Sequence, residues 1–159
     1  RLADHAEFFS FYLYLSVSAY FSEQHLDGFA HWMRIQTQEE TLHAMKFFDF
    51  ILERGGAPKL ETLTAPPNTW KTPLAAFEAV YEHEQAVTEG IHKLVDLARK
   101  NSDHPTDAFL QWFVTEQVEE EATALAIVEK LKMIGDNSMG ILMIDQELGQ
   151  RTAAPAGGE

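Results

Sequence analysis

The sequence predicts an all-α protein, a four-helix bundle with a long crossover connection and a short fifth helix at the C-terminal end. Three observations lead to this fold. Apolar residues recur with helical spacing in nearly every segment, and no alternating pattern of a strand competes with them. Four of these segments are long enough for helices of about 40 Å. The connection between the second and third segments is long, whereas the other two are short.

The first two helices are predicted to form an antiparallel hairpin. The first runs from the start of the chain to about Gln24, and the second from about Gly28 to Arg54. Between them lies a short connection, in which Asp27 has the residue type of an N-cap. Two glycines follow Arg54 and end the second helix. A connection this short makes the two helices antiparallel neighbours.

The connection at residues 55–72 contains three prolines and can span the length of the bundle, so the second and third helices can run parallel. Thr72 caps the third helix, in which Pro73 takes the first helical position. The remaining helices follow after polar breaks and extend over about residues 73–100, 105–135 and 139–148.

Length and composition favour one globular domain at residues 1–150, followed by a tail at residues 151–159 that is predicted to be disordered. Apolar residues make up 45% of the chain, which excludes disorder of its body. Cysteine is absent, which excludes disulfides and iron–sulfur ligation and fits a reducing, cytoplasmic compartment. The most apolar run, residues 8–21, is too short for a membrane span and follows acidic residues, unlike a signal peptide.

The net charge of −13 comes from 25 acidic and 12 basic residues. A nucleic-acid-binding protein would normally carry a basic face, so we expect no nucleic-acid partner. An acidic surface attracts cations, although charge alone is equally satisfied by a solvated acidic surface.

Polar groups interrupt the apolar stripe of each predicted long helix near the middle of the bundle. A buried carboxylate without a partner costs several kcal/mol or stays protonated. Four such groups at one level are therefore hard to explain as packing, whereas cations between them would explain the pattern. The candidate ligands, in chain order, are Glu7, Glu40, His43, Glu84, Gln117 and Glu120.

The spacing of these groups repeats in the two hairpins. Glu7 precedes Glu40 by 33 residues, and Glu84 precedes Gln117 by the same number. Glu40 and Gln117 each begin a pair three residues apart, which shares one helix face. A lone carboxylate and such a pair from each hairpin match the ligand pattern of di-metal carboxylate bundles.

The donor set indicates the metal and its handling. Ligands rich in oxygen with a single imidazole suit iron or manganese better than a structural zinc. The four carboxylates carry four negative charges, which two Fe(II) ions balance. The first half of the site contains the imidazole and is expected to bind more strongly than the second, in which Gln117 stands. Such an asymmetric site is expected to pass iron on.

The alternative to a metal site is that these polar groups lie in the core by chance or form ion pairs at the surface. A second Glu-x-x-His pair, Glu89 with His92, lies on another face of its helix and is predicted to be at the surface.

Four segments resemble those of the bacterial non-haem ferritins, and the resemblance covers about residues 1–150. These are GFAHWM at 28–33, QEETLHAM at 38–45, YEHEQ at 81–85 and FLQWFVTEQVEEE at 109–121. The resemblance implies a ferritin-like four-helix bundle that assembles into a homo-oligomeric cage of 24 subunits. It also implies oxidation of Fe(II) by dioxygen or hydrogen peroxide, with storage of a ferric mineral in the cage.

The resemblance also implies roles for individual residues. Glu7, Glu40 and His43 would hold the first iron, with Glu40 bridging to a second iron at Glu84 and Glu120, beside Gln117. Tyr14 would be a nearby electron donor, or else a packed aromatic. A third, weaker iron site would use Glu39, Glu116 and Glu119, which otherwise form a solvated acidic face. Asp107 would line a three-fold entry channel, or simply complement the dipole of its helix.

Departures from related families narrow the prediction. Bacterioferritins carry a second Glu-x-x-His on the fourth helix, where this chain has Gln117 and Glu120. Their haem-binding methionine directly follows the bridging glutamate, where this chain has Thr41, so no haem is expected. Rubrerythrins usually add a cysteine-ligated iron domain, and mini-ferritins place their ligands between subunits. Phe11 stands where relatives commonly have a small polar residue.

Two alternatives remain open. The same di-iron site could serve an oxidase or peroxidase that acts on a small molecule without storing iron, which would require a substrate cavity beside the metals. A non-catalytic helical scaffold would contain no paired metals. The fifth helix favours assembly, because its GILMI segment at 140–144 is too apolar to be left in water.

Overall fold

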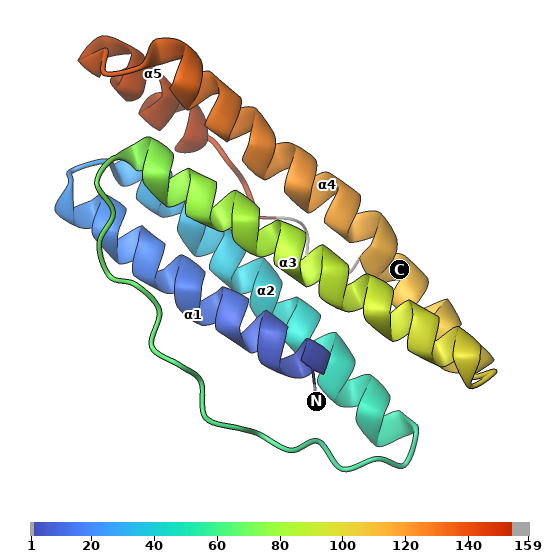
Figure 1. The fold of residues 1–159 in the computed structure, drawn as a ribbon. Coiled ribbons are helices and arrows are strands. Elements are labelled where there is room, and N and C mark those ends of the chain that lie inside the picture. Colours follow the sequence, from blue (N-terminus) through green and yellow to red (C-terminus); the bar gives the residue numbers. More distant parts are fainter. Residues whose placement is uncertain (1, 154–159) are drawn as a thin grey trace.

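The computed structural model describes the backbone of residues 2–153 and the side chains of residues 8–153. Over these residues the protein is all-α, a four-helix bundle with a short C-terminal helix, as predicted (Figure 1). The helices are α1 (Leu2–Glu23), α2 (Asp27–Glu53), α3 (Pro73–Lys100), α4 (His104–Ile134) and α5 (Ser138–Leu148). Of the tail predicted at residues 151–159, residues 154–159 lie outside the described residues.

Two antiparallel hairpins make up the bundle. The α1–α2 pair packs beside the α3–α4 pair, and the connection after α2 runs along the outside of the bundle back to the start of α3 (Figure 1). This return makes α2 and α3 run in the same direction, as the length of the connection predicted. Helix α5 lies against the start of α2 and the end of α4.

Side-chain caps begin three of the helices. Thr72 accepts a hydrogen bond from the backbone N–H of Ala75 at 3.1 Å, directly before Pro73. Asp103 caps α4 and Asn137 caps α5 in the same way. A cap of this kind stabilises a helix by about 1 kcal/mol. Consequently, α4 and α5 each begin one residue earlier than predicted.

The start of α2 differs from the sequence expectation. Asp27 is the first residue inside α2, and the N-cap is Leu26, which makes no side-chain cap hydrogen bond. The free N–H groups are instead satisfied by Asp145 of α5, whose carboxylate accepts from Gly28 N at 2.8 Å and Phe29 N at 3.0 Å. The prediction of Asp27 as the cap was wrong because a residue distant in the sequence supplies the acceptor.

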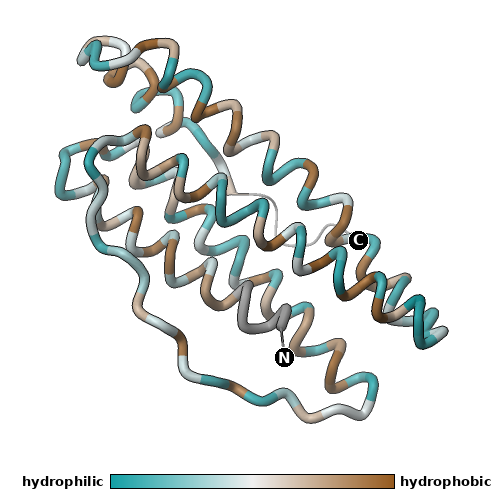
Figure 2. The backbone as a smooth tube through the Cα atoms, viewed as in Figure 1, coloured by the Kyte–Doolittle hydropathy of each residue, from teal (hydrophilic) through white to brown (hydrophobic). Residues whose placement is uncertain are grey.

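Apolar residues recur along every helix (Figure 2), and those that are buried form two clusters. The larger cluster lies at the α5 end and contains Phe21, Phe29 and Phe77. The smaller cluster lies toward the opposite end and contains Phe47 and Phe113 with neighbouring aliphatic residues. Because the helices are aligned side by side, the polar residues between these sequence positions form a layer between the two clusters.

No helix among the described residues combines the length and the hydropathy that crossing a membrane would need. Several large apolar side chains are nevertheless exposed on the isolated subunit. Met133, Met139 and Met143 are each more than 60% exposed. This surface is consistent with the predicted packing of α5 against other subunits.

Candidate metal centre

Five of the six predicted ligands lie in the polar layer with their side chains buried. The sixth, Glu7, belongs to α1, but its side chain lies outside the described residues. The buried five are Glu40 and His43 of α2, Glu84 of α3, and Gln117 and Glu120 of α4. The structure thus brings together, from three helices, residues that the sequence separates by up to 80 positions.

Three of these side chains converge on one point. Glu40, His43 and Glu120 each present a potential ligand atom, and these atoms lie within 4.8 Å of one another. His43 Nδ1 is 3.6 Å from Glu40 Oε2 across one turn of α2. Among the described residues, this is the one group of three acidic, histidine or cysteine side chains that meets this limit. Two carboxylates and an imidazole are donors that fit Fe(II).

Glu84 lies in the same layer but is held differently. Its Oε1 accepts a hydrogen bond from the Tyr14 hydroxyl. Its Oε2 accepts from Gln117 Nε2 at 3.1 Å, and the same amide contacts the backbone oxygen of Glu84 and the hydroxyl of Thr88, each at 3.2 Å. Tyr14 and Gln117 therefore both lie beside Glu84.

Burial and mutual repulsion keep two of the carboxyl groups protonated at neutral pH. Burial, followed by the charge of Glu40, raises the pKa of Glu84 to about 8. Burial, together with Glu84 and Glu40, raises the pKa of Glu120 to about 8 as well. Within the described residues, neither group forms an ion pair with lysine or arginine. A bound cation would supply the positive charge that this layer lacks.

The same glutamates also shift the pKa values of two neighbouring groups, Tyr14 and His43. Burial raises the pKa of Tyr14 well above its usual value, and the charges of Glu84 and Glu40 raise it further, so the phenol is neutral. For His43, burial acts to lower the pKa, but the hydrogen bond and charge of Glu40 outweigh it and the pKa is raised. A divalent cation bound at His43 would have to displace any proton that this ring carries.

Gln36 also belongs to the site, although it is not among the ligands that the sequence pattern predicted. Its Nε2 donates to Glu40 Oε1 at 3.1 Å and to Glu120 Oε2 at 2.6 Å. Gln36 thereby links two of the three converging side chains across helices α2 and α4. The signal for this role was an amide one helical turn before Glu40 in an otherwise apolar stripe.

The predicted third site is more open. Glu119 is exposed, and Glu116 is partly exposed. Burial, offset by His43, raises the pKa of Glu116, and the charges of Glu119 and Glu39 raise it further. Glu39 forms an ion pair with Arg151, with Nη2 and Oε2 2.6 Å apart. Arg151 is in the segment predicted to be a tail, and its side chain packs against α2.

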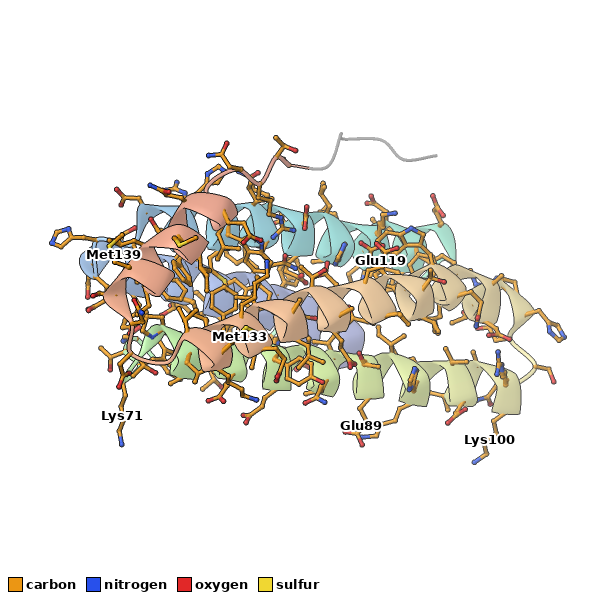
Figure 3. The ribbon with its side chains drawn as sticks, turned by 90° about the horizontal axis from the view of Figure 1, so that it is seen from above. Lys71, Glu89, Lys100, Glu119, Met133 and Met139 are labelled. Carbon is orange, nitrogen blue, oxygen red and sulfur yellow. The ribbon has the colours of Figure 1, made fainter. Side chains whose placement is uncertain are left out.

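The second Glu-x-x-His pair lies apart from the polar layer. Glu89 points away from the bundle (Figure 3), and its side chain is 71% exposed. Its Oε2 lies 3.5 Å from Lys93 Nζ.

Asp107, at the start of α4, accepts hydrogen bonds from Arg99 at 3.0 Å and Gln111 at 2.8 Å. These contacts place Asp107 on the outside of the subunit, far along α4 from Glu120.

Comparison with known proteins identifies the class to which this fold and site belong. The family model described as a ferritin-like domain matches residues 5–134. The chain therefore belongs to the ferritin family. Iron binding is implied by membership of this family, and ferroxidase activity is typical of it.

Individual relatives define the group more closely. The chain is 50% identical over 146 residues to a bacterial non-heme ferritin of Bacteroides fragilis strain 638R, covering 92% of this chain and 91% of the relative. It is 37% identical over 142 residues to that of Escherichia coli O6:H1, covering 89% and 86%. The prediction of a bacterial non-haem ferritin is confirmed, and the chain is an iron-storage ferritin subunit.

Solved structures agree with this assignment. An open-pore ferritin of the hyperthermophilic archaeon Archaeoglobus fulgidus superposes with a TM-score of 0.93 at 55% identity, covering 94% of this chain and 91% of that chain. A structure described as a humanized archaeal ferritin gives a TM-score of 0.95 at 53% identity, covering 96% and 93%. The ferritin fold therefore extends over nearly all of this chain.

Proposed function

We propose that this subunit is a ferroxidase, which oxidises Fe(II) to Fe(III) at a two-iron site and passes the product to a mineral inside a cage of 24 subunits. The observation that carries the proposal is the convergence of Glu40, His43 and Glu120 within 4.8 Å inside a buried layer. Iron is the substrate in this proposal, and the protein supplies the ligands, the charge and the path of the proton. No haem takes part, since Thr41 follows Glu40.

The first iron would be held by Glu7, Glu40 and His43, and the second by Glu84 and Glu120 with Gln117 beside it. Glu40 is suited to bridge because its charge acts on both Glu84 and Glu120. Each Fe(II) gives up one electron. The two electrons reduce dioxygen with two protons to hydrogen peroxide, or reduce hydrogen peroxide with two protons to water.

The raised pKa values of Glu84 and Glu120 make the binding of Fe(II) depend on pH. Without metal, Glu84 and Glu120 carry protons at neutral pH because their pKa values are about 8. Fe(II) must displace these protons to gain the carboxylates, so metal binding releases protons and strengthens as the pH rises toward 8. The released protons are available to the reduced oxidant.

Tyr14 is the proposed electron donor beside the metals. Its hydroxyl donates to Glu84, a proposed ligand of the second iron. When the neutral phenol gives one electron to the dioxygen or peroxide at the site, it also releases its proton, and Glu84 is in contact to accept this proton once a metal has displaced its own. The structural alternative is a buried tyrosine whose hydroxyl is simply satisfied by that carboxylate.

A weaker third site at Glu39, Glu116 and Glu119 completes the proposal. It lies next to the first iron, because the charge of Glu116 acts on His43. Glu39 can serve as a ligand there only after it leaves Arg151. Occupancy of this site is therefore expected only at a higher iron concentration than the two-iron site requires.

Glu40→Ala tests the proposal. We expect Fe(II) oxidation, followed by the absorbance of the ferric product, to slow by on the order of tenfold or more while light scattering shows an intact cage. Glu89→Ala is the matched control, since it removes a glutamate from an exposed Glu-x-x-His pair. Unchanged kinetics in an intact Glu40→Ala cage would contradict ferroxidase function at this site. A count of iron per assembly distinguishes storage from oxidation of a small molecule, because the latter retains only about two irons per subunit.

A further inference from the structure

We propose that Arg151, beyond the end of α5, is a positioning residue for the metal centre. It fixes the orientation of the Gln36 amide, and Gln36 in turn holds Glu40 and Glu120 in their converging arrangement. The inference rests on the proposed iron site, which Glu40 and Glu120 help to form.

The Arg151 side chain contacts three residues of α2. Its Nη1 donates to Gln36 Oε1 at 2.8 Å, and its Nη2 donates to Glu39 Oε2 at 2.6 Å. The guanidinium also lies over the ring of Trp32, with its central carbon 4.3 Å from the ring centroid. The side chain is 20% exposed, so these contacts are largely shielded from solvent. A planar fork with several N–H donors can make these contacts simultaneously, which an ammonium group cannot.

Hydrogen-bond chemistry determines which way the Gln36 amide faces. Arginine has donors and no acceptors, whereas a carboxyl group offers at least one acceptor oxygen whether it is ionised or protonated. An amide between the two must turn its oxygen to Arg151 and its NH₂ to Glu40 and Glu120, and the structure has this arrangement. The opposite orientation would set the amide NH₂ against the guanidinium donors and the amide oxygen against the carboxylates. Arg151 therefore removes a rotational freedom that Gln36 would otherwise have.

The Gln36 amide determines how close two of the proposed ligands, Glu40 and Glu120, lie to each other. Gln36 Nε2 contacts Glu40 on its own helix and Glu120 on α4. With its amide fixed, one group holds both carboxylates toward His43. Groups that orient metal ligands typically contribute about 10–100-fold to metal affinity. Arg151 acts one contact further out, so its effect must pass through Gln36.

The tertiary structure ties Arg151 to this position. Asp145 of α5 accepts hydrogen bonds from Gly28 N and Phe29 N at the start of α2. This approach requires glycine, since a Cβ at Gly28 would lie 1.7 Å from the backbone oxygen of Asp145. The backbone oxygen of Arg151 is itself 2.8 Å from His31 Nε2. The docking of α5 on α2 therefore places the guanidinium beside Gln36.

Binding of Co(II) alone to the metal-free cage, followed by its d–d absorption, tests the inference without iron oxidation. We expect Arg151→Leu and Gln36→Leu each to weaken Co(II) binding by about tenfold and to change the spectrum of the bound ion. The double variant should be no weaker than Gln36→Leu alone, because Arg151 acts through Gln36. Arg54→Leu is the matched control. It removes the same charge from an arginine that pairs with Asp103, far from the metal centre, and should bind Co(II) as the unmodified protein does.

Each outcome bears on the inference. Equal Co(II) binding by Arg151→Leu and Arg54→Leu would overturn it, and so would additive losses in the double variant. If Arg151→Leu does not assemble, Arg151→Lys carries the test: a severalfold loss is expected because lysine cannot reach Gln36 and Glu39 together, and undiminished binding would overturn the inference. Co(II) binding that is insensitive to Glu40→Ala would instead contradict the proposed metal site, so the two failures are distinguishable.

Discussion

The two sides of the polar layer differ in how their carboxylates are held. Glu40 and Glu120 converge with His43, and one amide, that of Gln36, donates to both carboxyl groups. Both oxygens of Glu84, by contrast, already accept hydrogen bonds from Tyr14 and Gln117. A metal must therefore displace protein donors to bind Glu84, whereas ligand atoms of Glu40, His43 and Glu120 already lie close enough together to share one ion.

This difference sharpens the asymmetry that the sequence predicted. Glu120 was expected to belong to the looser half because it comes from the second hairpin. In the structure without metal it lies with Glu40 and His43 of the first hairpin. The convergent group crosses the two hairpins, so we infer that the first metal to enter is held there. A second metal must then take Glu120 and draw Glu84 from its partners. Sequential filling of this kind suits a site that passes its iron on.

The largest expected effect is the difference in Co(II) affinity between variants of His43 and of Gln117. His43→Ala removes a neutral nitrogen ligand from the convergent group and should weaken the first Co(II) binding step by on the order of 100-fold. Gln117→Ala removes a donor to Glu84 and should leave that step within about threefold, changing mainly the second step. Isothermal titration of the metal-free cage measures both steps. Equal losses of the first step in the two variants would contradict the asymmetry.

A pH dependence of intermediate size tests the buried carboxyl groups. In the folded state the pKa values of Glu84 and Glu120 lie near 8, above the ordinary value of 4.5. The folded metal-free protein therefore retains protons that the unfolded chain releases. The contribution of these two groups to stability should be greatest below about pH 4.5 and fall as the pH rises to 8, by up to about 1.4 kcal/mol per pH unit for each group. Interaction between the two carboxyl groups spreads this loss over the window.

Thermal unfolding of the metal-free cage between pH 5 and 8 measures this effect. Glu84→Gln should make the decline shallower, since a neutral amide has no proton to lose. Saturating Co(II) should also flatten the decline, because the metal takes the place of the protons. A melting temperature that does not change over this range in the metal-free protein would show that the carboxyl groups are already ionised.

The smallest expected effect concerns Tyr14. Tyr14→Phe removes a hydroxyl that donates to Glu84 but removes no proposed metal ligand. Co(II) affinity should change by less than about threefold, whereas the radical signal of an oxidised tyrosine should be absent from electron paramagnetic resonance spectra after Fe(II) is oxidised. Tyr20→Phe is the matched control, since Tyr20 packs against Trp70 away from the polar layer. A radical signal that persists in Tyr14→Phe would assign the electron donor elsewhere.

The sequence by itself determined the helices and the inward-facing ligands. Helical periodicity and local caps such as Thr72 are properties of neighbouring residues, so they could be read without knowledge of the fold. The repeated spacing of 33 residues put Glu84 and Gln117 at one level, because the two helices of a hairpin pair in register. Resemblance to known ferritins then supplied the metal and the reaction.

Only the tertiary structure decided which of these groups meet and what holds them. The cap of α2 comes from Asp145, more than a hundred residues from Gly28, and the orientation of Gln36 comes from Arg151. No local pattern marks these contacts, because they depend on where α5 docks. The same packing brought Glu120 to Glu40 and His43, while Glu84 stayed with Tyr14 and Gln117. The sequence shows which side chains are available, but which of them contact one another depends on how the helices pack.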